Sequence, residues 1–323
     1  MREEAGRAAR FEGPHRVRIE SSEVGEPAAN QVRVKLEGCG VCGSNLPVWQ
    51  GRPWFSYPFD PGVPGHEGWG RVSAVGSRVH EFTPGDRVAV LSGNAYADYD
   101  FATPEQLVRL PPQLEGKPFP GEPLACAVNI FHRSGISAGQ LVAIVGIGFI
   151  GAALTALASL AGARVVAISR RPFALEMAQR CGADAVVKFD DPTRTLREAR
   201  RLSADGGYER VIECVGSQGA LDLASELCAT RGRLIIAGYH QDGPRHVDLQ
   251  QWNWRGLDVI NAHERDPAVY KRAMQEAVEL VVSGKLKPGL LFTHSFPLED
   301  ISAAFTALEQ RPHGFLKALV LCA

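Results

Sequence analysis

The sequence predicts an α/β protein in which a small β-barrel domain precedes a doubly wound parallel sheet. Short valine-rich runs separated by Gly and Pro turns fill the first part of the chain, and strand-like runs alternate with helix-like runs from about residue 124 onward. With 323 residues, the chain has room for about two domains. We expect a first domain over 1–123, a second over 124–262, and a C-terminal segment over 263–323.

The first domain is predicted from strand periodicity. Val32, Val34 and Leu36 alternate with charged residues, as the side chains of a half-buried strand do. Residues 70–90 form a second valine-rich run, which a Pro-Gly-Asp turn at 84–86 interrupts. The stretch 111–123 contains five prolines and is expected to connect the two domains.

The second domain is predicted from strand-like runs and the helices between them. The expected strands are 141–145, 164–169, 185–187, 209–214, 233–237 and 257–261, and the expected helices are 150–161, 172–181 and 219–229. This βαβ rhythm predicts a parallel, doubly wound sheet. In the C-terminal segment we expect a helix over 268–282 and a strand over 318–321.

A glycine-rich turn follows the first of these strands. Gly146, Gly148 and Gly151 form the pattern G-x-G-x-x-G between a predicted strand and a predicted helix, with Phe149 and Ile150 inside the pattern. Such glycines permit a tight turn, the close approach of a pyrophosphate to the backbone, and close packing of helix on strand. The sequence therefore predicts a dinucleotide site, with these five residues at the cofactor. The alternative is an ordinary strand-to-helix turn.

The next predicted strand ends in residues that favour NADP over NAD. NAD sites usually place Asp or Glu at this point to bind the ribose 2′-hydroxyl, whereas a neutral residue followed by arginine accommodates a 2′-phosphate. Here Ser169 is followed by Arg170 and Arg171. We predict that these three residues contact the cofactor. The alternative is that both arginines are solvated at the strand end.

Cysteine, histidine and glutamate form a second constellation. Cys39 and Cys42 are spaced as CxxC, His66 and Glu67 follow, and Glu122 lies further along the chain. Zinc binds these ligand types, and three protein ligands with an open fourth position mark a catalytic site. No second CxxC is present, so a four-cysteine structural site is not expected.

In this order, the motifs resemble the zinc-dependent medium-chain dehydrogenase/reductase superfamily, in its sorbitol and threonine dehydrogenase-like branch. The resemblance covers essentially the whole chain and implies a GroES-like catalytic domain, an inserted Rossmann domain and a C-terminal return to the first domain. It also assigns roles to individual residues. Cys42 and His66 would be zinc ligands, Glu67 and Glu122 would bind the metal or lie beside it, and Ser44 would pass on the alcohol proton. Cys214 and Val215 would lie beside the nicotinamide, unless they are an ordinary strand end.

Three departures from the family pattern modify these expectations. Asn45 stands where the family usually has an Asp that orients the zinc histidine, so Asn45 is expected to accept that hydrogen bond more weakly. Pro47 stands where a proton-relay histidine is common, so the proton must leave by another route. Residues 90–111 contain no cysteine, which predicts one catalytic zinc per chain and no structural zinc.

The candidate substrate residues come from both domains. Trp49 and Trp54 lie between the cysteine and histidine motifs, and Asn261 and His263 follow the last strand of the second domain. Aromatic side chains beside polar ones suit a sugar, polyol or cyclitol, although core packing would explain either tryptophan equally well.

The leading hypothesis is a zinc-dependent oxidoreductase that transfers a hydride between a secondary alcohol, or the matching ketone, and NADP. Two alternatives stay open. One is a zinc-free quinone or enone reductase of the same fold, which would have no use for Cys42, His66 and Glu122 together. The other is a nucleotide-binding sensor without turnover, which Asn45 and Pro47 would favour.

Composition restricts the partners. Lys and Arg number 35 against 36 Asp and Glu, so the chain has no net positive charge that would attract nucleic acid or an anionic membrane. A small molecule is therefore the expected partner.

The uncharged stretch 134–163 could span a bilayer by length, but its glycines predict the strand, turn and helix described above. Seven scattered cysteines and a charged N-terminal stretch without an apolar segment predict a cytoplasmic protein. The resemblance implies a homodimer or homotetramer.

Overall fold

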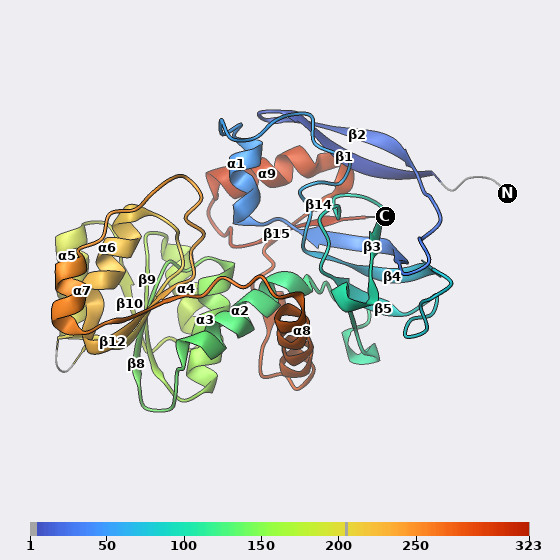
Figure 1. Cartoon of the computed structure of the whole chain (residues 1–323). Coiled ribbons are helices and arrows are strands. Elements are labelled where there is room, and N and C mark those ends of the chain that lie inside the picture. Colours follow the sequence, from blue (N-terminus) through green and yellow to red (C-terminus); the bar gives the residue numbers. More distant parts are fainter. Residues whose placement is uncertain (1–4, 204–205, 323) are drawn as a thin grey trace. The chain divides into compact units, whose positions relative to one another are not determined.

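The protein is described by a computed structural model that covers residues 5–203 and 206–322. The chain divides into two compact units, one formed by 1–125 together with 266–323 and the other by 126–265 (Figure 1). The boundaries expected from the sequence, after residues 123 and 262, fall slightly earlier. Among the helices of the described residues, none combines the length and hydropathy that crossing a bilayer requires.

The first unit is built on a seven-stranded sheet. Its order is β14-β15-β3-β4-β5-β7, and β6 pairs with β3. The strands are β3 (Val32–Gly40), β4 (Gly68–Val75), β5 (Arg87–Val90), β6 (Tyr99–Ala102), β7 (Leu107–Arg109), β14 (His294–Pro297) and β15 (Ala318–Leu321). A separate hairpin consists of β1 (Ala5–Gly13) and β2 (Arg16–Glu23). Because β15 pairs antiparallel with β3, the C-terminal segment returns to the sheet that β3 to β7 form.

An aromatic cluster lies at the centre of the first unit. Phe305 of α9 (Ile301–Gln310) has its ring centroid 5.1 Å from Phe11, 5.5 Å from Trp49 and 5.7 Å from Tyr96. All four side chains are buried. The same unit contains α1 (Leu46–Trp49) and α8 (Pro267–Val282). The short helix α1 and the C-terminal α9 are thus held in one core.

The second unit is a six-stranded parallel sheet with the order β10-β9-β8-β11-β12-β13. Its strands are β8 (Leu141–Val145), β9 (Arg164–Ser169), β10 (Ala185–Lys188), β11 (Tyr208–Glu213), β12 (Cys228–Ile236) and β13 (Asp258–Asn261). Numbered along the chain, this is the 3-2-1-4-5-6 order of the Rossmann fold. The order reverses between β8 and β11, and in such sheets a dinucleotide binds at the carboxyl ends of the strands on either side of that point.

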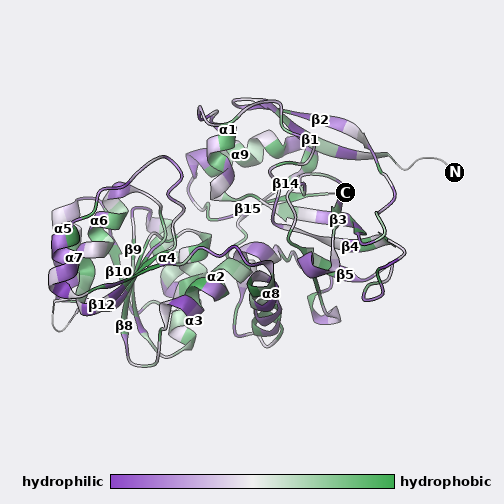
Figure 2. Ribbon diagram, in the orientation of Figure 1, coloured by the Kyte–Doolittle hydropathy of each residue, from purple (hydrophilic) through white to green (hydrophobic). Residues whose placement is uncertain are grey.

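Helices cover both faces of this sheet. Figure 1 shows α3 (Phe149–Leu160) and α4 (Pro172–Arg180) on one face, and α5 (Pro192–Arg201), α6 (Gln218–Leu227) and α7 (Leu249–Arg255) on the other. Figure 2 shows hydrophobic strands between them and hydrophilic surfaces on α5 and α7. A further helix, α2 (Gly121–Ser134), carries the chain from the first unit into the second. The helices α2, α5 and α7 were not among the helices expected from the sequence, and α6 ends at Leu227, where β12 begins with Cys228.

Candidate functional site

Three potential metal ligands meet in the first unit. The ligand atoms of Cys42, His66 and Glu67 all lie within 4.8 Å of one another. The pairing of β3 with β4 explains their proximity, because it sets Cys39 opposite Gly68 and so brings the residues after β3 beside those before β4. In the described part of the chain, no other trio of His, Cys, Asp or Glu is arranged in this way.

The imidazole of His66 is oriented by a backbone carbonyl. Its Nδ1 lies 2.9 Å from the Pro64 carbonyl oxygen, and since a carbonyl only accepts, Nδ1 carries the proton. Nε2 is then the nitrogen available to a metal. Burial lowers the pKa of His66, but its hydrogen bond with Cys42 and the charges of Cys42, Glu122 and Glu67 raise that pKa to about 10 overall. The negative groups around His66 therefore favour a positive charge at this cluster.

Glu67 is fully buried beside a lysine. Lys317 Nζ donates to Glu67 Oε1 at 2.6 Å and lies 2.5 Å from Oε2. Even so, Oε2 receives no hydrogen bond of good geometry from the described residues. A Cβ at Gly40 would lie 1.8 Å from the same Oε2, so only glycine leaves room for the carboxylate. Lys317 thus compensates the charge of the whole carboxylate, while Oε2 still lacks a well-directed hydrogen bond.

Lys317 was not predicted as a site residue. It precedes β15, and the pairing of β15 with β3 brings it to the cluster. Burial lowers the pKa of Lys317, but the charge of Glu67 and other negative groups raise it more, so the ammonium stays charged. The signal available in the sequence was a lone lysine within the apolar run from Phe315 to Leu321.

Glu122 lies in the first turn of α2, and its side chain is half-buried. It falls outside the group of three ligands whose atoms lie within 4.8 Å. Its charge nevertheless raises the pKa of both His66 and Lys317, which places the carboxylate near the cluster. Glu67 is therefore the carboxylate closer to the two other ligands.

The hydroxyl of Ser44 faces the cysteine ligand. It lies in a short 3₁₀ turn over Gly43–Asn45, and Ser44 Oγ donates to Cys42 Sγ at 3.2 Å. Its distance to Asn45 Oδ1 is 3.4 Å. Pro47 is buried at the start of α1. The Ser44 hydroxyl and the Cys42 thiol thus belong to one local structure.

The structure corrects the expected role of Asn45. Instead of accepting from His66, Asn45 donates through Nδ2 to the Pro64 carbonyl at 3.1 Å and to Tyr96 Oη at 3.0 Å. Pro64 is therefore the shared acceptor of His66 and Asn45. Tyr96, which the sequence did not single out, is fully buried and donates to the Gly40 carbonyl at 3.4 Å. An amide and a backbone carbonyl replace the carboxylate that orients the zinc histidine in the family.

The three glycines of the G-x-G-x-x-G pattern meet three different constraints. Gly146 has φ of +98°, and a Cβ there would lie 2.4 Å from Val215 Cγ2. A Cβ at Gly151 would lie 2.1 Å from the Gly146 carbonyl oxygen, so α3 packs against the turn. A Cβ at Gly148, the N-cap of α3, would meet open space. Gly146 and Gly151 therefore have structural roles. Gly148 instead leaves the N-terminus of α3 open to a ligand, which is the arrangement that binds phosphates.

Residues around the turn are placed as follows. Phe149 is buried and Ile150 is half-buried in the first turn of α3. Ser169 is buried at the end of β9, and its Oγ accepts from Arg171 N at 3.4 Å. Arg171 donates through a terminal guanidinium nitrogen to the Ile147 carbonyl at 3.3 Å, which brings its charge to the glycine-rich turn. Arg170 is exposed.

The turn after β11 contains Cys214, which is half-buried, and Val215, which is 41% exposed. The preceding residue, Glu213, is fully buried and was not predicted to matter. Its Oε1 accepts from the backbone N–H groups of Val215 at 2.7 Å and of Gly216 at 2.9 Å. A carboxylate directly after the apolar pair Val211 and Ile212, at the end of the strand, was the signal that could have marked it.

Two of the four substrate candidates lie in the first unit and two in the second. Trp49 is 3% exposed in the core, and its Nε1 donates to Glu309 Oε2 at 3.2 Å. Trp54 is 50% exposed. In the second unit, Asn261 is exposed at the end of β13, and the exposed His263 stacks on Tyr239 at 6.1 Å. Core packing and this hydrogen bond explain the position of Trp49. The side chains of Trp54, Asn261 and His263 are exposed.

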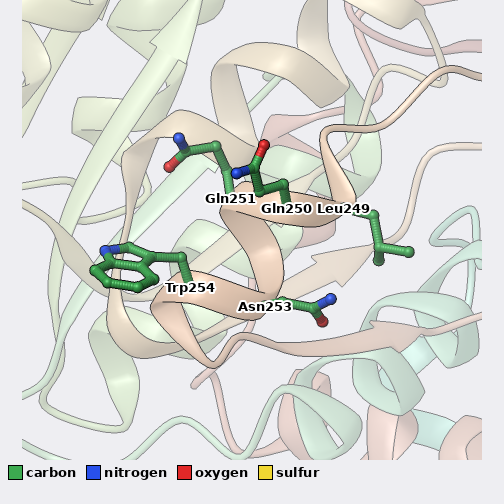
Figure 3. Close-up of a pocket in the computed structure, with 5 residues that line it drawn as sticks. All are labelled: Leu249, Gln250, Gln251, Asn253 and Trp254. Carbon is green, nitrogen blue, oxygen red and sulfur yellow. The ribbon is translucent and has the colours of Figure 1, made fainter.

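A surface pocket lies on α7 and contains none of the predicted site residues. It is lined by Leu249, Gln250, Gln251, Asn253 and Trp254 (Figure 3). Trp254 is 86% exposed. The pocket has no titratable or metal-binding side chain, so it offers no group for acid–base or redox catalysis.

The chain matches two sequence families: Alcohol dehydrogenase GroES-like domain over residues 28–111, and Zinc-binding dehydrogenase over residues 150–282. Sorbitol dehydrogenase of Ovis aries is 28% identical, covering 96% of this chain and 94% of its own. A 2-dehydro-3-deoxy-L-galactonate 5-dehydrogenase of Pseudoalteromonas atlantica is 26% identical and covers 98% of both chains. A Sinorhizobium meliloti structure bound to NADP has a TM-score of 0.85 with 26% identity, covering 99% of this chain and 100% of its own.

The chain therefore belongs to the zinc-binding alcohol dehydrogenase superfamily of medium-chain dehydrogenases. It is an NAD(P)-dependent dehydrogenase that acts on alcohol groups with zinc and a nicotinamide cofactor.

Proposed function

We propose that this enzyme oxidises a secondary alcohol of a polyol, sugar or cyclitol to the ketone, and runs the reverse reduction, with NADP as its preferred cofactor and one zinc ion per chain. The cluster of Cys42, His66 and Glu67 is the observation that carries the proposal. Two relatives over nearly the full length are dehydrogenases of a polyol and of a sugar acid by name, which supports the substrate class.

The donor set fits zinc. A thiol, an imidazole with its Nδ1 proton fixed, and a carboxylate with an oxygen that lacks a hydrogen bond supply the ligand types that zinc binds. We assign Cys42, His66 and Glu67 as the protein ligands, with Glu122 beside them. When bound, zinc supplies Lewis acidity that stabilises an alkoxide. Lys317 offsets the charge of Glu67 and so keeps the buried cluster from carrying excess negative charge.

Proton release is assigned to Ser44. Its hydroxyl lies 3.2 Å from the Cys42 sulfur, within reach of a molecule bound at the cluster. Ser44 accepts the alcohol proton and passes it to water or to the cofactor ribose, because Pro47 has no side-chain group that could take it. The second unit holds the nicotinamide in position for hydride transfer, through the glycine-rich turn and the turn formed by residues 214–216.

The preference for NADP rests on the end of β9. Ser169 removes the carboxylate that would repel a 2′-phosphate, Arg171 already lies at the glycine-rich turn, and Arg170 is exposed. One charged hydrogen bond to the phosphate favours NADP over NAD by about 10- to 150-fold. The double variant Ser169→Asp with Arg170→Ala should reverse the preference in kcat/KM. A higher kcat/KM with NAD in the unmodified enzyme would contradict this assignment.

The substrate class is tested by a screen. The unmodified enzyme is mixed with polyols, cyclitols, sugar alcohols and simple secondary alcohols, each with NADP and with NAD, and the absorbance of the reduced nicotinamide is followed. We expect turnover with at least one polyhydroxylated compound that exceeds turnover with simple alcohols. Turnover only with enones or quinones would favour the zinc-free reductase. Tight cofactor binding without turnover of any class would favour the sensor.

The cytoplasm is the proposed location. All seven cysteines are free thiols, as the reducing interior of a cell would keep them.

A further inference from the structure

Three charged or polar side chains form a hydrogen-bond network beside the carboxyl ends of β11 and β12 in the second unit. Glu213 ends β11, whereas His240 and Arg245 lie in the segment between β12 and α7. Glu213 is 0% exposed; its Oε1 accepts from the backbone N–H groups of Val215 and Gly216, and its Oε2 lies 3.0 Å from His240 Nε2. Both oxygens of this buried carboxylate therefore accept hydrogen bonds, Oε1 from the backbone of the turn formed by residues 214–216 and Oε2 from the side chain of His240.

The hydrogen bonds define the tautomer of His240. Arg245 Nε donates to His240 Nδ1 at 2.8 Å, so Nδ1 is an acceptor and the proton resides on Nε2, which donates to Glu213. Arg245 also donates through a terminal nitrogen to the Gly216 carbonyl at 2.8 Å. Gly216 is thus held at its N–H by Glu213 and at its carbonyl by Arg245. The four residues close a ring of hydrogen bonds, in which Arg245 and Glu213 carry opposite charges.

The two chain segments joined by this ring are in direct backbone contact. Gly216 has φ of +81°, and a Cβ there would lie 2.5 Å from the Tyr239 carbonyl oxygen. A Cβ at Gly238 would lie 2.2 Å from Gly216 N and 2.6 Å from Glu213 Oε2. No side chain separates the segments, so a displacement of His240 or Arg245 would be transmitted to the turn formed by residues 214–216.

That turn adjoins the point where the strand order reverses. Val215 lies against the glycine-rich turn, since a Cβ at Gly146 would be 2.4 Å from Val215 Cγ2. A dinucleotide in this fold crosses from one half of the sheet to the other at the reversal. The end of β9, with Ser169, belongs to the adenosine half, whereas β11 and β12 lie on the opposite side of the reversal. The 214–216 turn therefore belongs to the nicotinamide half of the site.

We propose that Glu213, His240 and Arg245 are positioning residues for the nicotinamide half of the cofactor. They hold the 214–216 turn in one conformation and so set the position of the nicotinamide for hydride transfer. The proposal rests on the proposed function in one respect only, namely that the second unit binds a nicotinamide dinucleotide.

The test compares two ligands in the full-length protein. NADPH carries both halves of the dinucleotide, whereas 2′,5′-ADP carries only the adenosine half with its phosphates. His240→Ala removes both hydrogen bonds of the imidazole and should weaken NADPH binding about tenfold, as expected for loss of a charged hydrogen bond. Binding of 2′,5′-ADP should change less than twofold. Both affinities are measured by titration calorimetry, and kcat should fall together with the affinity for NADPH.

Two further variants separate positioning from folding. His240→Gln should restore most of the NADPH affinity, because an amide can accept from Arg245 and donate to Glu213. His246→Ala is the matched control, because His246 lies in the same segment, its side chain is exposed, and its hydrogen bonds with Gln218 are made by its backbone N–H and carbonyl groups. Its affinity for both ligands should equal that of the unmodified protein. If His240→Ala does not fold, Arg245→Lys replaces it, because lysine keeps the charge and loses the planar fork.

Equal weakening of both ligands would show that the network only supports the fold, and unchanged NADPH affinity would show that it does not position the cofactor. Either result overturns the proposal while leaving the proposed function in place. If the unmodified protein bound neither ligand, the proposed function itself would fail, and the positioning role with it.

Discussion

At the scale of single residues, the geometry of the candidate metal site formed by Cys42, His66 and Glu67 depends on the groups that contact each side chain. His66 is fixed by the Pro64 carbonyl, and Glu67 by Lys317. Ser44 contacts the sulfur of Cys42. The chemistry of the site therefore depends on backbone and lysine contacts as much as on the ligands themselves.

Ser44→Ala should slow alcohol oxidation by about 10²- to 10⁴-fold, the usual contribution of a general acid–base group. The hydroxyl is the side-chain oxygen beside Cys42, and Pro47 provides no substitute. Steady-state kcat over a range of pH is the measurement, with zinc content and cofactor affinity as controls that should not change. An unaltered rate and pH profile would remove Ser44 from the proton path.

Zinc affinity should rise with pH. In the metal-free protein the pKa of His66 is raised to about 10, so the imidazole is protonated at neutral pH, whereas zinc binds only the unprotonated form. Each metal ion bound therefore displaces at least one proton, and the affinity should increase about tenfold per pH unit below that pKa. Competition with a chelator at three pH values measures this slope. A flat dependence would contradict the raised pKa.

At the scale of elements, local sequence patterns predicted most of the fold. The site residues that were not predicted come together only through contacts between distant parts of the chain. The strands of the second unit and the glycine-rich turn were predictable because periodicity and turn residues are local signals. Lys317 joins the cluster only through the pairing of β15 with β3, which no local pattern encodes. Tyr96 reaches Asn45 in a similar way, across 51 positions of the chain. The short helix α7 has seven residues, most of them polar, and gave too weak a pattern to predict.

The glycine-rich turn allows a test that separates binding from folding. Gly148→Ala places a methyl group where nothing lies within 4 Å, so it should leave thermal stability unchanged and weaken cofactor binding, because the second glycine of this pattern is the one that lets a pyrophosphate approach the backbone. Gly151→Ala places a Cβ 2.1 Å from the Gly146 carbonyl and should destabilise the protein by about 1–3 kcal/mol. Thermal unfolding and NADPH titration measure both. Equal behaviour of the two variants would contradict the separate roles.

At the scale of the whole molecule, the chain divides its chemistry between its two units. The first unit contains the metal cluster, completed by the returning C-terminal segment, and the second contains the dinucleotide fold. The dinucleotide fold and the class of enzyme were predictable from motifs, since each motif consists of residues close together in the sequence. The identity of the alcohol was not, because a substrate surface is assembled from residues that carry no such local signature.

The central claim is that one zinc ion at Cys42, His66 and Glu67 makes the enzyme active. Metal-free protein is titrated with zinc while NADP-linked oxidation of the best polyol is followed, with Cys42→Ser as the variant and Cys39→Ser, a buried cysteine outside the cluster, as its matched control. Activity should rise from near zero and saturate at about one zinc per chain in the unmodified enzyme and in Cys39→Ser, and stay near zero in Cys42→Ser. Full activity before zinc is added, or a requirement for a second ion, would contradict the account.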